Sequence, residues 1–231
     1  MNNIPKPSPV PEPVNPQDLA HIYWLGGSPC SGKSSISRRL ARRSGLGLYS
    51  VDEALPGHLA RLDPHRHPTL DAWVAASWDD RWLKPVEVLV AEAYACYREH
   101  FTLVLEDLLA TPRETPLLVE GTALLPSDLA GLGIPARNAV WVVPTREFQN
   151  LQYSQRSWVN GILSECSQPE TAFSNWMERD AQFAGQIKEE VTAAGYPLLM
   201  VDGQASLEEN TAWVAARFGL GPTSPDDPLG S

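Results

Sequence analysis

The feature that most constrains the fold of this chain is a glycine-rich segment, Gly27-Ser28-Pro29-Cys30-Ser31-Gly32-Lys33-Ser34. It matches the pattern G-x-x-x-x-G-K-[ST] at every fixed position. An apolar run, Ile22 to Leu25, precedes it, and a segment with helical character follows from Ser35. A strand, this loop and a helix are together the context in which the pattern binds phosphate. The alternative is a glycine-rich turn that only caps a helix. The full match and its flanks favour a nucleoside-triphosphate site.

The residue types of the loop suit a triphosphate. Glycines allow a tight curl, successive backbone amides form an anion-binding nest, and the helix start adds partial positive charge. We expect the Lys33 ammonium to reach the β and γ phosphates, and the Ser34 hydroxyl to bind Mg²⁺, which prefers oxygen ligands. The predicted cofactors are ATP and Mg²⁺. The predicted phosphate-binding residues are Gly27, Ser28, Pro29, Cys30, Ser31, Gly32, Lys33, Ser34 and Ser35.

Composition limits the remaining classes of function. The 231 residues suit one α/β domain with inserted segments, and the net charge of −10 argues against general nucleic-acid binding. No apolar run approaches the length of a membrane span, and no signal peptide is recognisable, so we expect no membrane partner. Three distant cysteines do not form a disulfide framework, which indicates a reducing cytoplasm. Among them, Cys30 could have its pKa lowered by the helix start, or could simply be a small residue that fits the loop.

The order of segments predicts the architecture. Residues 1–18 carry six prolines and are expected to form a flexible tail, with partner docking as an alternative; residues 222–231 are a second expected tail. Between them, the domain at 19–221 is expected to be a three-layer α/β/α fold with a parallel sheet. The expected strands are Ile22–Gly26, Leu48–Val51, Leu117–Val119, Ala139–Val143 and Leu198–Val201. The expected helices are 33–44, 85–110, 146–163, 169–194 and 206–218. Long gaps after the second and fourth strands predict extra helices at the edge where ligands bind.

With the loop and this order of segments, the chain resembles the P-loop kinases of small molecules, in the nucleoside-monophosphate-kinase-like group that includes shikimate kinase and antibiotic phosphotransferases. The resemblance covers about residues 20–220 and rests on motif order. It implies a five-stranded sheet of order 2-3-1-4-5, an acceptor-binding insert at 54–113 and a lid region at 146–194. No adenylate-kinase-type sequence for a nucleoside monophosphate is present, so a nucleotide acceptor is not carried over.

Two carboxylates are expected at strand ends. In related kinases an aspartate lies where Asp52 follows the second strand, and it can take the acceptor's hydroxyl proton or hold a metal-bound water. Glu53 is the alternative, although alternation turns it the other way. Glu120 closes the third strand, where a Walker B acid would lie. The predicted metal site is therefore Ser34, Asp52 and Glu120. Helix capping is the other explanation for both acids, with Glu120 capping a short helix at Ser127.

Arginines and aromatic side chains complete the predicted site. Arg156 and Arg179 resemble lid arginines by position, and guanidinium groups suit the charge of a transferring phosphoryl group; surface salt bridges are the alternative. With Lys33 and Asp52 they are the predicted catalytic residues. The insert also contains His65-Arg66-His67, which could suggest a metal, and Trp78 and Trp82, which share a helix face best explained by core packing. The nucleotide base is expected near Asp202 to Ser206, where Ser206 and Glu209 also match a capping box.

The sequence thus predicts an ATP- and Mg²⁺-dependent phosphotransferase acting on a hydroxyl or phosphate of a small-molecule acceptor. A nucleotide-dependent switch or binding protein is the rival from another class. It would need a water-positioning residue and a switch loop, and neither is recognisable. The [NT]-K-x-D segment with which GTPases read guanine is also missing from the sequence.

Overall fold

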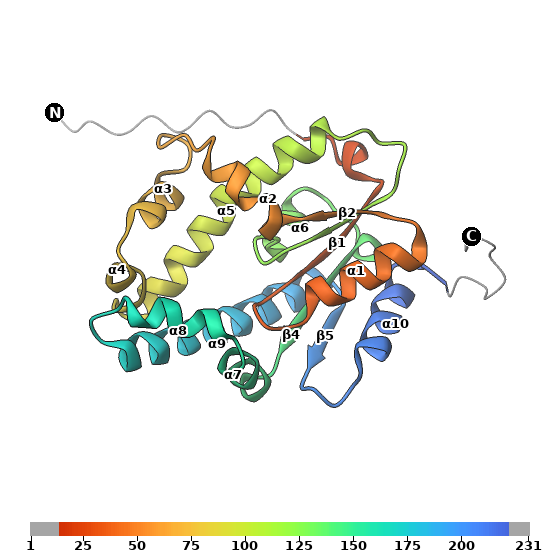
Figure 1. Ribbon diagram of the computed structural model, residues 1–231. Coiled ribbons are helices and arrows are strands. Elements are labelled where there is room, and N and C mark those ends of the chain that lie inside the picture. The colour runs from red at the N-terminus through yellow and green to blue at the C-terminus, as the bar shows by residue number, and fades with distance from the viewer. Residues whose placement is uncertain (1–13, 222–231) are drawn as a thin grey trace, which may run out of the picture.

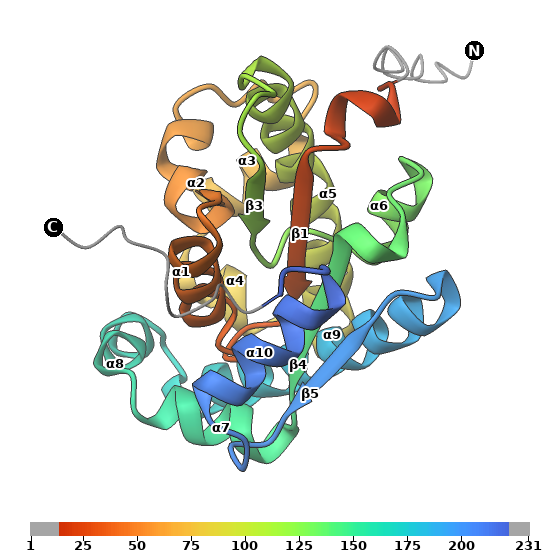
Figure 2. The same ribbon diagram turned by 90° about the vertical axis from the view of Figure 1, so that its right-hand side faces the viewer.

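The computed structural model describes residues 14–221, which form one α/β unit around a five-stranded sheet. All four strand pairings are parallel, and the strand order is β2-β3-β1-β4-β5. The predicted fold class and the predicted order 2-3-1-4-5 are therefore confirmed. Figure 1 shows the sheet between two groups of helices, and Figure 2 shows its strands side by side. The strands are β1 (Ile22–Gly27), β2 (Gly47–Ser50), β3 (Leu117–Glu120), β4 (Ala139–Pro144) and β5 (Leu198–Val201).

The helices fall in the gaps that the sequence predicts. A short 3-10 helix, η1, precedes the sheet, and another, η2, precedes β4. The elements are η1 (Pro16–Leu19), α1 (Lys33–Ser44), α2 (Val51–Leu59), α3 (Pro68–Ala75), α4 (Trp78–Trp82), α5 (Val86–Ala110), α6 (Pro126–Gly131), η2 (Ala136–Asn138), α7 (Arg146–Ser154), α8 (Ser157–Ser164), α9 (Pro169–Ala194) and α10 (Leu207–Arg217). Within residues 14–221, no helix is both long and apolar enough to cross a membrane.

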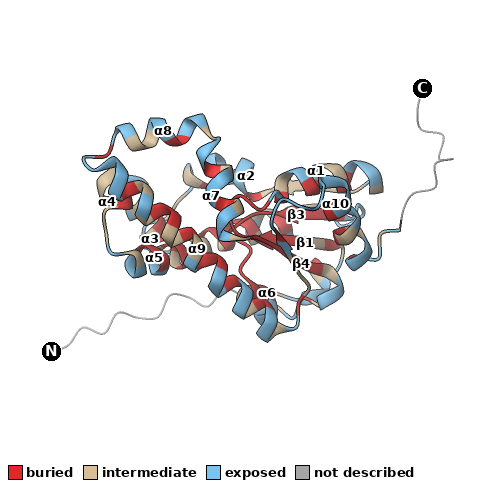
Figure 3. Cartoon of the chain, turned by 90° about the horizontal axis from the view of Figure 1, so that it is seen from below, coloured by how far each residue is buried: buried red, intermediate tan, exposed pale blue. Residues whose placement is uncertain are grey.

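Alternation along the strands produces two cores, one on each face of the sheet. On one face, Trp24 of β1 and Trp141 of β4 pack with side chains of α5, α6 and α9. On the other face, Leu25 and Val140 pack with α1 and α10. Successive residues of a strand point to opposite faces, so a strand buried on both faces reads as a continuous apolar run. Figure 3 shows the buried strands between helices whose outer faces are exposed.

The sequence misplaced several boundaries. Residues 1–13 and 222–231 lie outside the described part, so the predicted tails there have no structural test. Residues 14–18 are not an extended tail, because η1 forms and both Val14 and Leu19 pack against the core. The helix expected over 146–163 is divided into α7 and α8, which meet at Gln155 and Arg156. The second strand ends at Ser50, and Val51 already belongs to α2.

Candidate active site

The glycine-rich segment joins the end of β1 to the start of α1, as its pattern predicts. Gly32 adopts a left-handed conformation (φ 82°) directly before the helix starts at Lys33. The Lys33 side chain is buried, and its ammonium donates to the Ser28 carbonyl oxygen at 2.7 Å and to the Ser31 hydroxyl at 3.4 Å. Burial lowers the pKa of Lys33, and the negative charges of Asp52 and Glu120 oppose this shift. The loop thus holds a buried cation at a helix start, where an anion is stabilised.

A glycine is required at the first position of the loop. Gly27 has a φ of 137°, and a β-carbon there would overlap the backbone carbonyl oxygen of Val142 in the neighbouring strand β4. The loop can leave the sheet this close to β4 only because position 27 has no side chain.

Cys30 lies in the middle of the loop. Its backbone is left-handed (φ 64°), its side chain is buried, and burial raises the pKa of its thiol to about 11. A reactive thiolate would need a lowered pKa. The burial of Cys30 thus favours the alternative in which it is a small side chain that fits the loop. All three cysteines are free and buried.

Glu120 connects the end of the second strand to the phosphate loop. Its carboxylate accepts a hydrogen bond from the Ser50 hydroxyl at 2.7 Å and one from the Ser34 hydroxyl at 3.2 Å. Its side chain is buried, and this burial raises its pKa. The helix-cap alternative is wrong, because the Ser127 amide donates to Glu190 instead. The Glu120 carboxylate and the Ser34 hydroxyl together offer oxygen ligands, the type that Mg²⁺ prefers.

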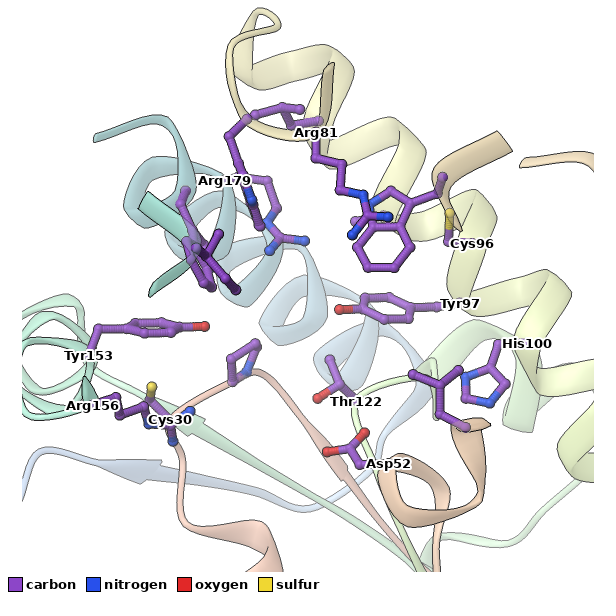
Figure 4. A pocket seen from close by; sticks show the side chains of 18 of the residues that line it. Cys30, Asp52, Arg81, Cys96, Tyr97, His100, Thr122, Tyr153, Arg156 and Arg179 are labelled. Atoms are coloured by element: carbon purple, nitrogen blue, oxygen red, sulfur yellow. The ribbon is translucent and has the colours of Figure 1, made fainter. Parts of the chain in front are cut away.

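Asp52 occupies a different element from the one predicted. It does not close β2 but lies in the first turn of α2, whose N-cap is Ser50. Asp52 therefore does not cap the helix, and it lines the same cavity as the phosphate loop. Glu53, the alternative acid, points elsewhere and pairs with Arg38 at 2.9 Å on the surface. Thr122, which the sequence did not single out, also lines this cavity, and Figure 4 shows it beside Asp52.

The two predicted lid arginines have different surroundings. Arg156 begins α8 and lies over the rings of Tyr153 and Trp158, at 5.3 and 5.8 Å from their centroids. Arg179 of α9 is largely buried and pairs with Asp180 at 2.6 Å, so its ion pair is internal and is not the surface salt bridge of the alternative. Both nevertheless line the cavity. Asp180 in turn accepts a hydrogen bond from Tyr153 at 2.5 Å. Arg156 is thus the less constrained of the two guanidinium groups.

One cavity of about 580 Å³ is lined by the phosphate loop, Asp52, Arg156 and Arg179, whereas Glu120 lies outside its lining. Its floor is the phosphate loop from Pro29 to Ser35 with Asp52, and its walls come from the first insert and the α7–α9 region (Figure 4). The volume lies in the range of small-molecule sites. The aromatic side chains in the walls are Trp73, Trp78, Trp82, Tyr97, Tyr153, Trp158 and Trp176.

The insert and the α7–α9 region meet through aromatic packing. The rings of Trp82 in α4 and Trp176 in α9 stack with their centroids 4.3 Å apart and their planes inclined by 15°. Trp82 is buried in a hydrophobic cluster, and Trp78 packs against the same cluster. The core-packing role predicted for this helix face is therefore confirmed. The contact also holds the two walls of the cavity against each other.

A polar network behind the cavity was missed by the sequence. His58 Nδ1 lies 2.7 Å from His100 Nε2, and His58 Nε2 lies 2.8 Å from a carboxylate oxygen of Asp107. Tyr49 donates to that same carboxylate oxygen at 2.7 Å. Burial, with His58 adding to it, lowers the pKa of His100 to about 4, and His100 lines the cavity. Because the Asp107 carboxylate only accepts, His58 donates to it through Nε2. A chain of polar contacts therefore links Asp107 through His58 to His100 at the cavity wall.

The two weaker motifs have structural explanations. His67 is buried, its Nδ1 accepts from the Asp63 amide, and Arg66 pairs with Glu106. In the part of the chain that the structure describes, no cluster of three His, Cys, Asp or Glu side chains could hold a metal ion. The Ser206–Glu209 capping box of α10 is confirmed. The predicted base-binding role of Asp202 to Ser206 stays a prediction.

Comparisons with known proteins show no family for this chain. No family model matches the chain, and no curated protein matches it. Among solved structures, TT1252 from Thermus thermophilus is 19% identical, with a TM-score of 0.44, and the match covers 84% of this chain and 96% of that one. Shikimate kinase from Acinetobacter baumannii in complex with shikimate is 14% identical, with a TM-score of 0.42, and the match covers 89% and 97%.

Proposed function

We propose that this chain is an ATP- and Mg²⁺-dependent phosphotransferase acting on a hydroxyl or phosphate of a small molecule. The observation that carries the proposal is the single cavity that the phosphate loop shares with the first insert. A donor phosphate at the loop would face an acceptor of small-molecule size in the same enclosure. Transfer requires this arrangement, because the reacting atoms must be held within contact distance and in line.

The residues present fit ATP and Mg²⁺. The loop amides and buried Lys33 would hold the phosphates. The Ser34 hydroxyl, with the carboxylates of Glu120 and Asp52, supplies oxygen ligands for a metal ion or its waters. When bound, ATP supplies the phosphoryl group and Mg²⁺ neutralises charge on its oxygens.

The chain's own side chains account for the rest of the chemistry. Asp52 would accept the proton of the attacking hydroxyl and orient its oxygen. Arg156 would reach the phosphoryl oxygens from the α7–α9 side, where its guanidinium lies over two aromatic rings and no carboxylate of residues 14–221 lies within 4.0 Å of it. Arg179, paired with Asp180, would hold the α9 wall of the cavity in place behind Arg156. We assign residues 54–113 to acceptor binding and 146–194 to a lid that excludes water from the cavity.

The direct experiment measures ATP consumption with and without a panel of small hydroxylated compounds. The proposal predicts that ATP is consumed only with a particular compound and that the compound gains one phosphoryl group, detected by mass spectrometry. If no compound is ever phosphorylated while a protein partner binds only in the presence of ATP, the rival switch function replaces this one.

A further inference from the structure

The cations of the first insert differ sharply in their partners. Five of them face carboxylates, and these pairs are Arg61–Asp107, Arg66–Glu106, Lys84–Glu92, Arg98–Asp128 and Arg113–Asp18. Arg81 is the exception among the insert's lysines and arginines, because no carboxylate of residues 14–221 lies within 4.0 Å of it. Its charge is therefore the one in the insert that the described chain leaves without a counter-charge.

Arg81 is also held in a fixed orientation. Its guanidinium carbon lies over two indole rings, 4.2 Å from the centroid of Trp73 and 4.5 Å from that of Trp78. Its Nη2 donates to the Val74 carbonyl oxygen at 2.8 Å, and its Nε is buried without a partner. Cation–π contact with the indole rings leaves the other guanidinium N–H groups as hydrogen-bond donors. The side chain is therefore held in advance for an anion that these N–H groups can bind.

The guanidinium faces the cavity from the end opposite the phosphate loop. Figure 4 shows Arg81 reaching into the cavity from one side, with Cys30 and Asp52 on the other. Among the carboxylates that line the cavity, Glu92 is neutralised by Lys84 at 2.7 Å. Burial lowers the pKa of Arg81, which reflects the cost of holding this cation away from water. An anion bound at this end would remove that cost.

We propose that the acceptor is an anion, with a carboxylate or phosphate that binds the edge of Arg81 and a planar or apolar body that packs on the surrounding tryptophans. This inference rests on the proposed function and names the class of its acceptor. The planar fork of arginine matches both oxyanions bidentately, so either group satisfies the geometry. The acceptor's reacting oxygen would then extend toward Asp52. Arg81 is a specificity-determining residue in this arrangement.

Simple probes test the inference without nucleotide. Benzoate and phenyl phosphate carry the two anionic groups on one ring, and benzamide and benzyl alcohol are their uncharged counterparts. Calorimetry or ligand-observed NMR should detect an anion binding more tightly than its uncharged counterpart. Arg81→Gln should lower the affinity for that anion by ~10-fold or more and leave the affinity for the uncharged probes unchanged. Benzoate alone would identify a carboxylate acceptor, and phenyl phosphate alone a phosphate.

Controls make the outcome decisive. Arg66→Gln removes another arginine of the same insert, which is paired with Glu106 on the surface, and should change nothing. Arg81→Lys keeps the positive charge but loses the planar pair of N–H donors, so it should bind anions with intermediate affinity. This variant also tests the inference if Arg81→Gln does not fold. If neither anion binds, or if anions bind both variants like the wild type, as they would at the phosphate loop, the inference is overturned.

The failure of this inference can be told apart from the failure of the kinase proposal. Anion binding that depends on Arg81, without phosphoryl transfer to any compound, leaves an anion-binding site at Arg81 standing and removes the kinase and, with it, the acceptor role of that anion. Transfer to an uncharged acceptor that Arg81→Gln does not slow removes the inference and leaves the kinase.

Discussion

Replacing Glu120 by glutamine should separate the stability of the fold from its affinity for metal. The carboxylate is 1% exposed and accepts hydrogen bonds from the hydroxyls of Ser50 and Ser34. Glutamine has nearly the same shape. Its oxygen can still accept from Ser50, and its amide can donate to the Ser34 oxygen, so both contacts survive. Only the charge is lost.

The expected change in unfolding free energy is small. Removing a buried charge is favourable, as the raised pKa of Glu120 indicates, but buried Lys33 loses a negative neighbour. These effects oppose each other, and we expect a net change within about 1 kcal/mol. A carboxylate beside a metal ion contributes about 10- to 100-fold in affinity. At an ATP concentration of about 100 times the wild-type Kd, stabilisation by ATP and Mg²⁺ should fall from about 2.7 to about 0.4–1.4 kcal/mol.

Urea denaturation with ATP in EDTA, and with ATP and Mg²⁺, measures this difference. Glu53→Gln is the matched control, because Glu53 lies nearby, is exposed and pairs only with Arg38. It should keep the full Mg²⁺-dependent stabilisation. The reasoning is refuted if Glu120→Gln gains as much from Mg²⁺ as the wild type, or if it loses several kcal/mol of stability without any ligand.

Three further predictions follow from the site and its support. Asp52→Asn should lower kcat for transfer by about 10²-fold with little change in ATP affinity; steady-state kinetics showing unchanged turnover would remove Asp52 from its role. Gly27→Ala should cost at least about 2 kcal/mol in urea denaturation, because its β-carbon would overlap the Val142 carbonyl, whereas Gly57→Ala, in open space on a helix, should be neutral or stabilising. Although burial would raise it, hydrogen bonds from His58, Tyr49 and Arg61 lower the pKa of Asp107 to about 2. Ionised Asp107 therefore contributes about 1–2 kcal/mol to the free energy of unfolding above about pH 4, and this contribution is lost as the pH falls toward 2. Asp107→Asn should abolish this loss. Equal changes of unfolding free energy with pH in the wild type and the variant would contradict the prediction.

Local patterns predicted most of the fold because they act over a few residues. The five apolar runs became the five strands, and the loop motif predicted the transition from β1 to α1. The placement of Asp52 failed although a local signal existed, since Ser50-Val51-Asp52-Glu53 reads as a helix start capped by Ser50. The break between α7 and α8 has no glycine or proline to mark it.

Side-chain pairings across the fold could not be predicted in this way. His58 and His100 are 42 residues apart, and Trp82 reaches Trp176 only through the packing of α4 on α9. Arg81 looked like one of many basic residues in the insert. Arg81 differs from the other lysines and arginines of the insert because, among the described residues, they pair with carboxylates and it does not. Only the tertiary structure determines these pairs.

The measurement that tests the central claim most directly follows the γ-phosphoryl group of ATP. Wild-type protein is incubated with Mg²⁺, γ-labelled ATP and individual small molecules, with the Lys33→Ala variant as the control for contaminating kinases. The claim predicts that label moves from ATP to one class of acceptor, with one ADP formed for each acceptor phosphorylated, and that the variant transfers none. Release of labelled inorganic phosphate at a rate that no added compound changes, with no labelled acceptor, would contradict it.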